Sequence, residues 1–562
     1  MEHTEFFQDG PRLSNQYESD RILRQFLAWR LPREVSEEIE PDLRRFGARV
    51  VGEMAELADR CELHPPVMRN FDPWGRRIDE VVLDPAWGRL QDIAAEEGVV
   101  ATAYERKHGA HSRLVQFAKL YLYSPSSAIF SCPLAMTDGA ARALELYGDE
   151  SLRRGPFRHL TSRNPKEFWT SGQWMTEKSG GSDVSGTATV AKPLGGGQFA
   201  LTGSKWFTSA TTAPMAMTLA RIEGAAEGSR GLSLFYLELR DESGLLNGVE
   251  VHRLKDKLGT RALPTAELSL RGTRARLVGG EGHGVRKIAS LFNITRVYNS
   301  VCAMANARRS LALAHDYSHR RRAFGRALTE LPLHAETLAD LWVEFEGNFL
   351  LTFHLGGLLG RDETGQAAPG ESALLRMLTP VAKLYTGKSA MAITSECVEI
   401  FGGAGYCEDT GLPRLLREAQ VFPIWEGTTN VLCLDMLRAM EKEGAFPPFL
   451  KDVTGRLGRV TDDALAPGAA KVREALAALR GFAEEAAGQG GEYMQASARR
   501  FAYSVARVYA ASLFLEFAQH LGTDVARERA RRWIARGLSG FLHPEESHRG
   551  LTRRILEEEP RA

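Results

Sequence analysis

Residues 175–183 of the chain read MTEKSGGSD, and residues 203–208 read GSKWFT. Glycines allow backbone amides to approach a planar ring or a phosphate, and the hydroxyls of Thr176 and Ser182 can bond polar ring atoms. Trp206 adds a flat aromatic face. Each piece alone has an ordinary explanation, because a Gly-Gly-Ser turn is most often only a turn and a strand tryptophan is most often core.

Short β-type segments surround these two stretches. Residues 232–239 and 266–270 have the composition of strands, and turn signals such as the glycines at 195–197 separate them. A compact β domain is the expectation for this part of the chain.

Both flanks of the β-rich region are helical in period. After Gly284 neither proline nor glycine occurs until Gly325, which predicts one long helix. Helical stretches at about 335–359 and 371–401, and another helix from near Thr429, would close a four-helix bundle.

The sequence therefore predicts an α+β protein with four regions. These are an N-terminal helical domain at 1–167, the β domain at 168–281, the four-helix bundle at 282–445 and a C-terminal helical extension at 446–562.

The composition excludes several classes of protein. Lysine plus arginine equal aspartate plus glutamate at 71 each among 562 residues, so global charge does not favour nucleic acid or an anionic membrane. The six cysteines lack the C-x-x-C spacing of a metal or redox site, which indicates reduced thiols and no metal. We expect a cytoplasmic protein without membrane insertion, because neither a secretory signal nor a membrane-spanning run is present.

Arginines gather where the long helix is expected to end. Residues 317–325 read YSHRRRAFG, and Arg296 precedes them on the same helix. Such arginines usually form a solvated face or interact favourably with the helix dipole.

Two further stretches are rich in glycine. Residues 399–406 read EIFGGAGY, a pattern that can be no more than a loop after a helix, and residues 425–430 read WEGTTN. Glu426 in the second stretch can be interpreted as a residue that only caps the helix from near Thr429.

Taken together, these stretches resemble the acyl-CoA dehydrogenase family, whose usual text is T-E-P-x-A-G-S-D, K-x-W-I-T, R-x-x-F-G, Q-x-x-G-G-x-G-Y and E-G-T. The match covers roughly residues 90–440 and keeps the domain order of that family. Glu399 stands where glutamine is usual, whereas Gly402 and Gly403 match.

The resemblance implies FAD as cofactor and Glu426 as the base that removes the α-proton of a fatty acyl-CoA while a β-hydride leaves for the flavin. Base and flavin must then face opposite ends of one C–C bond, and a carboxylate desolvated by the acyl chain would have a raised pKa. The resemblance places at FAD the residues Thr176, Ser182, Trp206, Thr208, Arg321, Phe324, Gly402, Gly403, Thr428 and Asn430. It places at the acyl-CoA the residues Ser182, Arg296 and Gly427.

The variant text and the C-terminal extension resemble one branch of the family, which contains AidB-type alkylation-response flavoproteins and related long acyl-CoA dehydrogenases. The alternative function in that branch is a DNA-associated flavoprotein with weak dehydrogenase activity. Its candidate contacts are Arg527, Arg529, Arg531, Arg532 and Arg536. A basic helix face is most often only solvated or ion-paired surface, so DNA is not favoured.

The resemblance also implies partners. An electron-transfer flavoprotein would accept the electrons, and Arg321 would reach the FAD pyrophosphate of a neighbouring subunit, as its bidentate guanidinium allows. A shared flavin site requires a homodimer or a homotetramer. The sequence leaves open both the choice between them and the acyl chain length.

Overall fold

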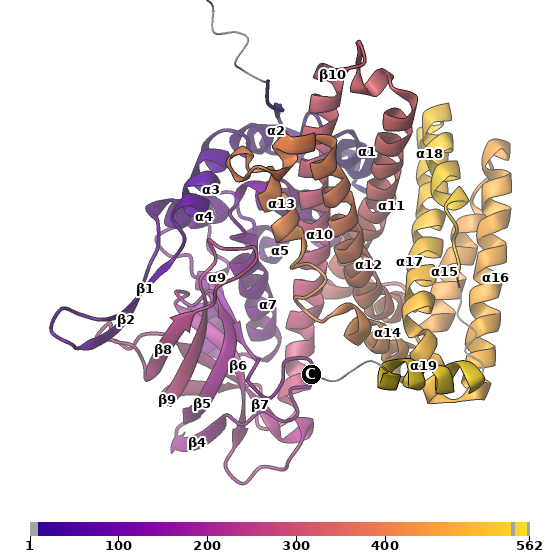
Figure 1. The fold of residues 1–562 in the computed structure, drawn as a ribbon. Coiled ribbons are helices and arrows are strands. Elements are labelled where there is room, and N and C mark those ends of the chain that lie inside the picture. The colour runs from indigo at the N-terminus through magenta and orange to yellow at the C-terminus, as the bar shows by residue number, and fades with distance from the viewer. Residues whose placement is uncertain (1–8, 541–545, 559–562) are drawn as a thin grey trace, which may run out of the picture.

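Helices α1 to α9 and one hairpin form the N-terminal part of the computed structural model, which describes residues 9–540 and 546–558 (Figure 1). The helices are α1 (Arg21–Arg30), α2 (Arg33–Arg49), α3 (Glu53–Leu63), α4 (Pro85–Glu96), α5 (Ala101–Glu105), α6 (Ser112–Tyr123), α7 (Ser131–Tyr147), α8 (Glu150–Leu152) and α9 (Arg158–Leu160). Helix α6 is buried along its whole length, so it is the centre of this part rather than its surface.

The hairpin was not expected in a region with helical periodicity. Strands β1 (Val67–Phe71) and β2 (Arg77–Val82) pair antiparallel and project from the body of the protein (Figure 1). Asp72 makes the turn, because its carboxylate accepts hydrogen bonds from the backbone amides of Trp74 and Arg76 at 2.8 and 2.9 Å. The sequence signalled the turn but not the strands, whose outward face is exposed and carries little hydrophobic pattern.

Seven strands form the central sheet, as the β-rich texture predicts. They are β3 (Ser171–Trp174), β4 (Val190–Gly195), β5 (Gln198–Ser209), β6 (Met215–Ile222), β7 (Leu232–Glu238), β8 (Val249–Leu254) and β9 (Thr265–Val278). Along the order β6-β4-β5-β9-β7 each strand pairs with the next, and β7 pairs back with β6, so the sheet closes on itself. Trp174, Phe199 and Phe235 fill its interior.

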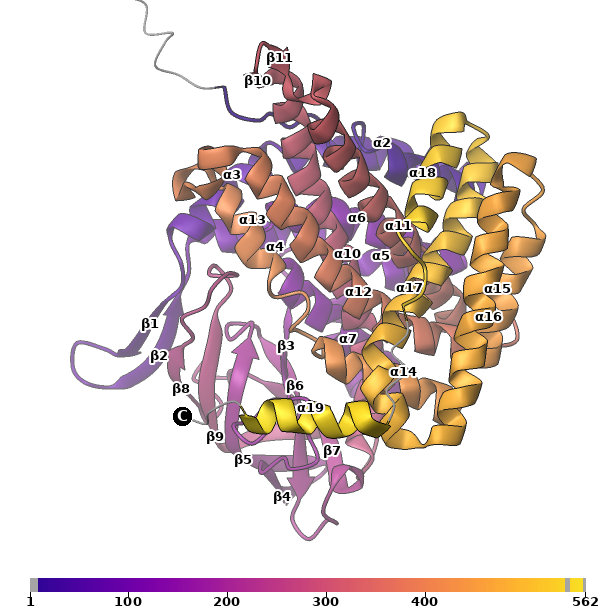
Figure 2. The same cartoon turned by 45° about the vertical axis from the view of Figure 1, so that its right-hand side comes forward.

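Four long helices follow the sheet. Helix α10 (Gly284–Arg320) is the predicted long helix, and α11 (Pro332–Glu363), α12 (Glu371–Ile400) and α14 (Thr429–Glu443) complete the bundle. A two-residue hairpin, β10 (Arg322–Ala323) with β11 (Arg326–Ala327), joins α10 to α11, and the short α13 (Leu412–Ala419) precedes α14. Helix α10 is buried around most of its circumference, because it lies between the N-terminal helices and the rest of the bundle (Figures 1 and 2).

A buried ion-pair network joins the N-terminal part to the bundle. The Arg113 guanidinium on α6 bonds Asp138 of α7 at 2.7 Å and Glu363 of α11 at 2.6 Å. The hydroxyl of Tyr298 on α10 donates to Asp138 at 2.8 Å. Buried charges of this kind require exact partners, so the network fixes how these helices meet.

The C-terminal extension begins with four helices that pack together against one side of the bundle (Figure 2). They are α15 (Phe446–Gly458), α16 (Ala466–Gln489), α17 (Gly491–Leu521) and α18 (Asp524–Ala535). Helix α19 (Glu546–Glu558) follows, and its residues 551–558 are exposed. Trp533 of α18 is fully buried, and a side chain added at Gly347 of α11 would meet its ring at 2.3 Å. Glycine at this position therefore lets the indole lie directly on α11.

All six cysteines are free thiols. Within the described ranges, no helix is long and apolar enough to cross a bilayer.

The docking of α18 on α11 gives a test of the fold. We expect Trp533→Ala to destabilise the attachment of the extension by about 3–5 kcal/mol, because it empties a closely packed site. The measurement is chemical denaturation combined with limited proteolysis. Val525→Ala, at an exposed position of the same helix, is the control and should change little. Equal effects of both substitutions would contradict the packing role of Trp533.

Candidate active site

Glu426 lies in a strained backbone turn between α13 and α14. Its φ is 58° and that of Gly427 is 108°, so two consecutive residues occupy the left-handed region. For a non-glycine residue this conformation costs roughly 1–2 kcal/mol. Thr428 is the N-cap position of α14, which begins at Thr429 as predicted.

Side chains of two bundle helices hold this turn. The Arg296 guanidinium of α10 donates from Nε to the carbonyl of Glu426 at 3.2 Å. The Lys383 ammonium of α12 donates to the carbonyl of Gly427 at 2.6 Å. The backbone conformation thus depends on the relative placement of α10, α12 and α14.

The Glu426 carboxylate points to α10 rather than to the start of α14. The Thr295 hydroxyl donates to Oε2 of Glu426 at 2.6 Å. The interpretation of Glu426 as a helix cap therefore does not describe its side chain. A half-buried carboxylate with one bonded oxygen and a fixed position has the geometry of a general base.

Arg296 also forms an ion pair with a carboxylate. Its Nη1 lies 2.7 Å from Asp435 of α14, and Asp435 also bonds Arg376 of α12 at 2.7 Å. The predicted contact of Arg296 with acyl-CoA would therefore have to share this guanidinium with Asp435 and the carbonyl of Glu426.

The start of α7 lies within the electrostatic reach of Glu426. Burial raises the pKa of the Cys132 thiol, and the Glu426 charge raises it further. Cys132 packs on a small apolar cluster of Met136, Ala210 and Ala213. The charge of Glu426 thus acts on a thiol that packs among apolar side chains.

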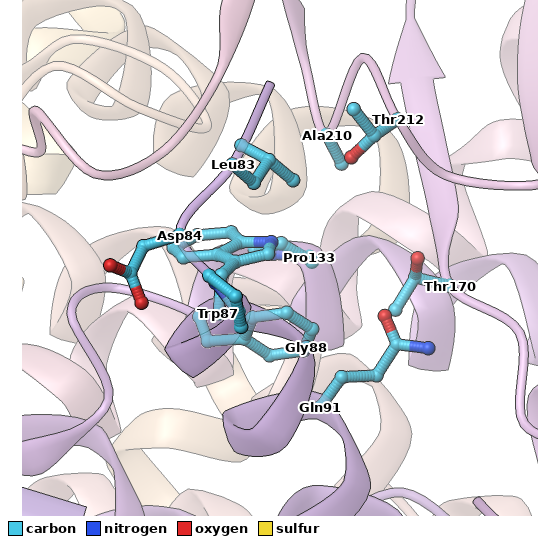
Figure 3. A pocket seen from close by; sticks show the side chains of 11 residues that line it. Leu83, Asp84, Trp87, Gly88, Gln91, Pro133, Thr170, Ala210 and Thr212 are labelled. Atoms are coloured by element: carbon cyan, nitrogen blue, oxygen red, sulfur yellow. The ribbon is translucent and has the colours of Figure 1, made fainter. Parts of the chain in front are cut away.

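A cavity of about 340 Å³ adjoins this cluster (Figure 3). It lies between α4, the start of α7 and the loop after β5, and Ala210 belongs both to its wall and to the cluster that Cys132 contacts. Trp87 and Phe130 line it with ring centroids 4.8 Å apart, and Gln91 and Thr170 add polar groups.

The two stretches of the β domain that the sequence singled out meet in space. The backbone amide of Trp206 donates to the carbonyl of Thr176 at 3.0 Å. Lys205 is fully buried and its ammonium lies 2.8 Å from Glu177. Burial lowers the pKa of Lys205. Burial is also the largest single influence on Glu177 and raises its pKa, but the Lys205 charge and the hydrogen bonds from Lys205, Thr189 and the Ala188 amide together hold that pKa below its usual value.

Two other residues of this domain that are predicted to bind FAD differ in their exposure to solvent. Ser182 is exposed, whereas Thr208 is buried and its hydroxyl donates to the carbonyl of Ala266 at 2.9 Å. The Lys255 ammonium lies 3.6 Å from the ring centroid of Trp206, so one aromatic face already has a cation over it.

Arg321 and Phe324 lie far from Glu426 within one chain. Both follow the C-terminal end of α10, 26 and 29 residues after Thr295, and a helix rises 1.5 Å per residue, so the separation is roughly 40 Å (Figure 1). The phenyl ring of Phe324 is 95% exposed. The rings of Tyr317 and Phe401 are 4.7 Å apart, which brings the glycines at 402 and 403 to this same end of the bundle.

Two more predicted residues flank the turn. Thr428 is exposed. Asn430, on the first turn of α14, accepts a hydrogen bond from Arg499 of the C-terminal extension at 3.5 Å.

The arginines proposed for DNA have partners inside the protein. All five lie near carboxylates: Arg527 to Asp462 at 2.8 Å, Arg529 to Glu346 at 3.6 Å, Arg531 to Glu528 at 2.6 Å, Arg532 to Glu336 at 2.8 Å and Arg536 to Glu344 at 3.9 Å. Arg536 also donates to the carbonyl of Asp340 at 3.1 Å. Much of the positive charge is thus compensated, and DNA contact by this cluster stays a prediction that the geometry does not favour.

Models of known families match almost the whole chain. Residues 11–164 match the adaptive response protein AidB N-terminal domain, 172–273 the acyl-CoA dehydrogenase middle domain, 282–441 the acyl-CoA dehydrogenase C-terminal domain and 445–553 the acyl-CoA dehydrogenase 11 C-terminal domain-like model. Acyl-CoA dehydrogenase family member 11 of Caenorhabditis elegans is 46% identical over 91% of this chain and 86% of its own.

The chain belongs to the acyl-CoA dehydrogenase family.

Other relatives agree with the branch that the sequence predicts. The putative acyl-CoA dehydrogenase AidB of Escherichia coli is 32% identical over 71% of this chain and 74% of its own. The crystal structure of C. elegans ACDH-11 in complex with C11-CoA superposes with a TM-score of 0.97 at 42% identity over all of both chains. A structure described as Bd2924 apo-form has a TM-score of 0.86 at 53% identity, covering 91% of this chain and all of its own. The predicted family, its fold and its C-terminal extension are confirmed.

Sequence reasoning missed three residues at the Glu426 turn: Thr295, Lys383 and Asp435. The signal for Lys383 was its position, since a lysine within the apolar run LTPVAKLYTG of a helix needs a partner. Thr295 and Asp435 left no comparable signal.

Glu177 provides a test of the β-domain segment. We expect Glu177→Gln to lower the stability of the β domain by about 3 kcal/mol, because Lys205 would keep a buried charge without its counter-ion. Thermal unfolding measures the effect. Asp183→Asn, an exposed carboxylate of the same loop, is the control. An unchanged melting temperature for Glu177→Gln would show that Lys205 does not depend on it.

Proposed function

We propose that this protein is an FAD-dependent dehydrogenase of fatty acyl-CoA thioesters, in which Glu426 removes the α-proton. The observation that carries the proposal is the Glu426 carboxylate, held by Thr295 on a turn fixed from two helices. FAD, when bound, supplies the acceptor for the β-hydride. The family of the chain supports the same reaction.

The residues of the β domain fit a flavin. The side-chain oxygen of Gln173 is buried and has no hydrogen-bond partner among the described residues. Trp174 beside it packs into the barrel, so the alternation of strand side chains turns Gln173 towards the helices. Gly181 lies so close to Thr176 that an added Cβ would be 3.1 Å from its methyl group. Thr176, Ser182, Trp206 and Gln173 would hold the ring system.

The substrate side of the proposal rests on the apolar environment of Glu426. Cys132, Met136 and Ala210 offer a surface suited to an acyl chain, which desolvates the carboxylate when it binds. The relative ACDH-11 is described in complex with C11-CoA. We propose a fatty acyl-CoA as substrate and an electron-transfer flavoprotein as electron acceptor.

We also propose a homo-oligomer, which the length of α10 supports. Arg321, Phe324, Gly402 and Gly403 lie at the end of the bundle opposite to Glu426, so in our proposal they serve the FAD of a second subunit. The guanidinium of Arg321 is exposed and suits a pyrophosphate.

Glu426→Gln tests the proposed base. The purified protein should be yellow and keep its flavin, while the rate of anaerobic flavin reduction by acyl-CoA falls at least about 100-fold, because the amide cannot accept the proton. Stopped-flow absorbance measures the rate. Glu443→Gln, at the C-terminal end of the helix α14 that follows the turn, is the control. A mutant that is reduced at the wild-type rate would assign the proton to another base.

Arg321→Ala tests the shared site. We expect flavin affinity to fall about 10- to 100-fold, the value of one charged hydrogen bond, without a change in melting temperature of the apoprotein. Flavin release on dilution measures it. Arg326→Ala in the same hairpin serves as control. Equal flavin affinity in both variants would remove Arg321 from the FAD site.

A further inference from the structure

Lys383 is a fully buried cation in the middle of α12. Its ammonium donates to the carbonyl of Gly427 at 2.6 Å. The charges that act on it are Glu426, which favours its protonated form, and Arg296, which disfavours it. Burial is the largest influence and lowers the pKa of Lys383 to about 7.

Other buried lysines of this chain have a carboxylate within contact distance. Lys205 has Glu177 at 2.8 Å, and Lys119 has Asp42 at 2.5 Å in addition to the carbonyl of Glu97 at 2.8 Å. The ammonium of Lys383 instead donates a hydrogen bond to a backbone carbonyl of the Glu426 turn. Desolvation of a cation is costly, so a buried lysine with this arrangement needs a compensating role.

The neighbouring charges are already paired. Arg296 and Arg376 share Asp435, so neither this carboxylate nor these arginines depend on Lys383 for a partner. The hydrogen bond of the Lys383 ammonium goes to the carbonyl of Gly427, directly after Glu426.

We propose that Lys383 is the positioning residue of Glu426: its ammonium fixes the Glu426–Gly427 turn through the carbonyl of Gly427 and so holds the carboxylate in place. The inference rests on the proposed role of Glu426 as base. It assigns to α12 a function in the reaction, although Lys383 itself touches neither substrate nor flavin in this role.

Two substitutions separate the parts of this role. Lys383→Met removes both the charge and the donor, whereas Lys383→Gln keeps a donor without charge. We expect the rate of anaerobic flavin reduction by acyl-CoA to fall about 10- to 100-fold in Lys383→Met, as for loss of one charged hydrogen bond, with a smaller change in half-saturating substrate. Lys383→Gln, which keeps a donor for the carbonyl of Gly427, should lose less activity than Lys383→Met, and Lys383→Arg should return the rate towards that of the wild type.

Lys119→Met is the matched control, since Lys119 is another buried lysine that bonds a backbone carbonyl, on α6. It should lower the melting temperature and leave the rate of flavin reduction unchanged. A wild-type rate in both Lys383→Met and Lys383→Gln would overturn the proposal.

The stability of the protein provides a readout that needs no substrate. A folded pKa near 7 against an unfolded value near 10.4 means that the unfolded chain binds more protons between these pH values. The cost of the buried charge is thus present below pH 7 and relieved as the pH rises. The melting temperature of the wild type relative to Lys383→Met should increase from pH 7 to 10, and a flat difference would overturn the buried charge. If acyl-CoA fails to reduce the wild-type flavin while this difference is present, the proposed function fails and the buried charge of Lys383 stands.

Discussion

The turn at Glu426 and Gly427 is the constraint on which the arrangement of the bundle depends. Two consecutive left-handed residues are unfavourable for a free chain, and only the second is glycine. The turn persists because Arg296 and Lys383 bond its two carbonyls from different helices. Any shift of α10 against α12 would break one of these bonds. The position of the carboxylate therefore depends on the packing of these helices.

Ion pairs outside the turn also hold these helices together. Asp435 of α14 bonds arginines of both α10 and α12, and therefore ties three helices at one point. Farther away, Arg113 joins α6 and α7 to α11 through two buried carboxylates. These ion pairs add little net stability, but each is strongly unfavourable when a partner is lost, so they favour a single register of the helices.

The sequence predicted well what is encoded locally. The absence of proline and glycine after Gly284 predicted α10, and the EGT text predicted both the loop and the start of α14. The β1–β2 hairpin was missed because its exposed strands carry no strong alternation. Thr295 was missed for a different reason, since its bond to Glu426 joins positions 131 residues apart and only the folded bundle brings them together.

The limit of prediction from local sequence is clearest for the charged residues. The arginines of α18 look in the sequence like a surface for phosphate, yet Arg532 is bonded to Glu336 of α11 and Arg529 lies near Glu346 of the same helix. Their position beside the buried Trp533 gives them an internal role, because ion pairs at the rim of that indole contact fasten the extension to the bundle. Lys383 of α12 gave a weaker signal than this cluster. It carries more of the argument for function, because its ammonium bonds the turn that holds the proposed base, whereas the charges of the cluster hold two parts of the fold together.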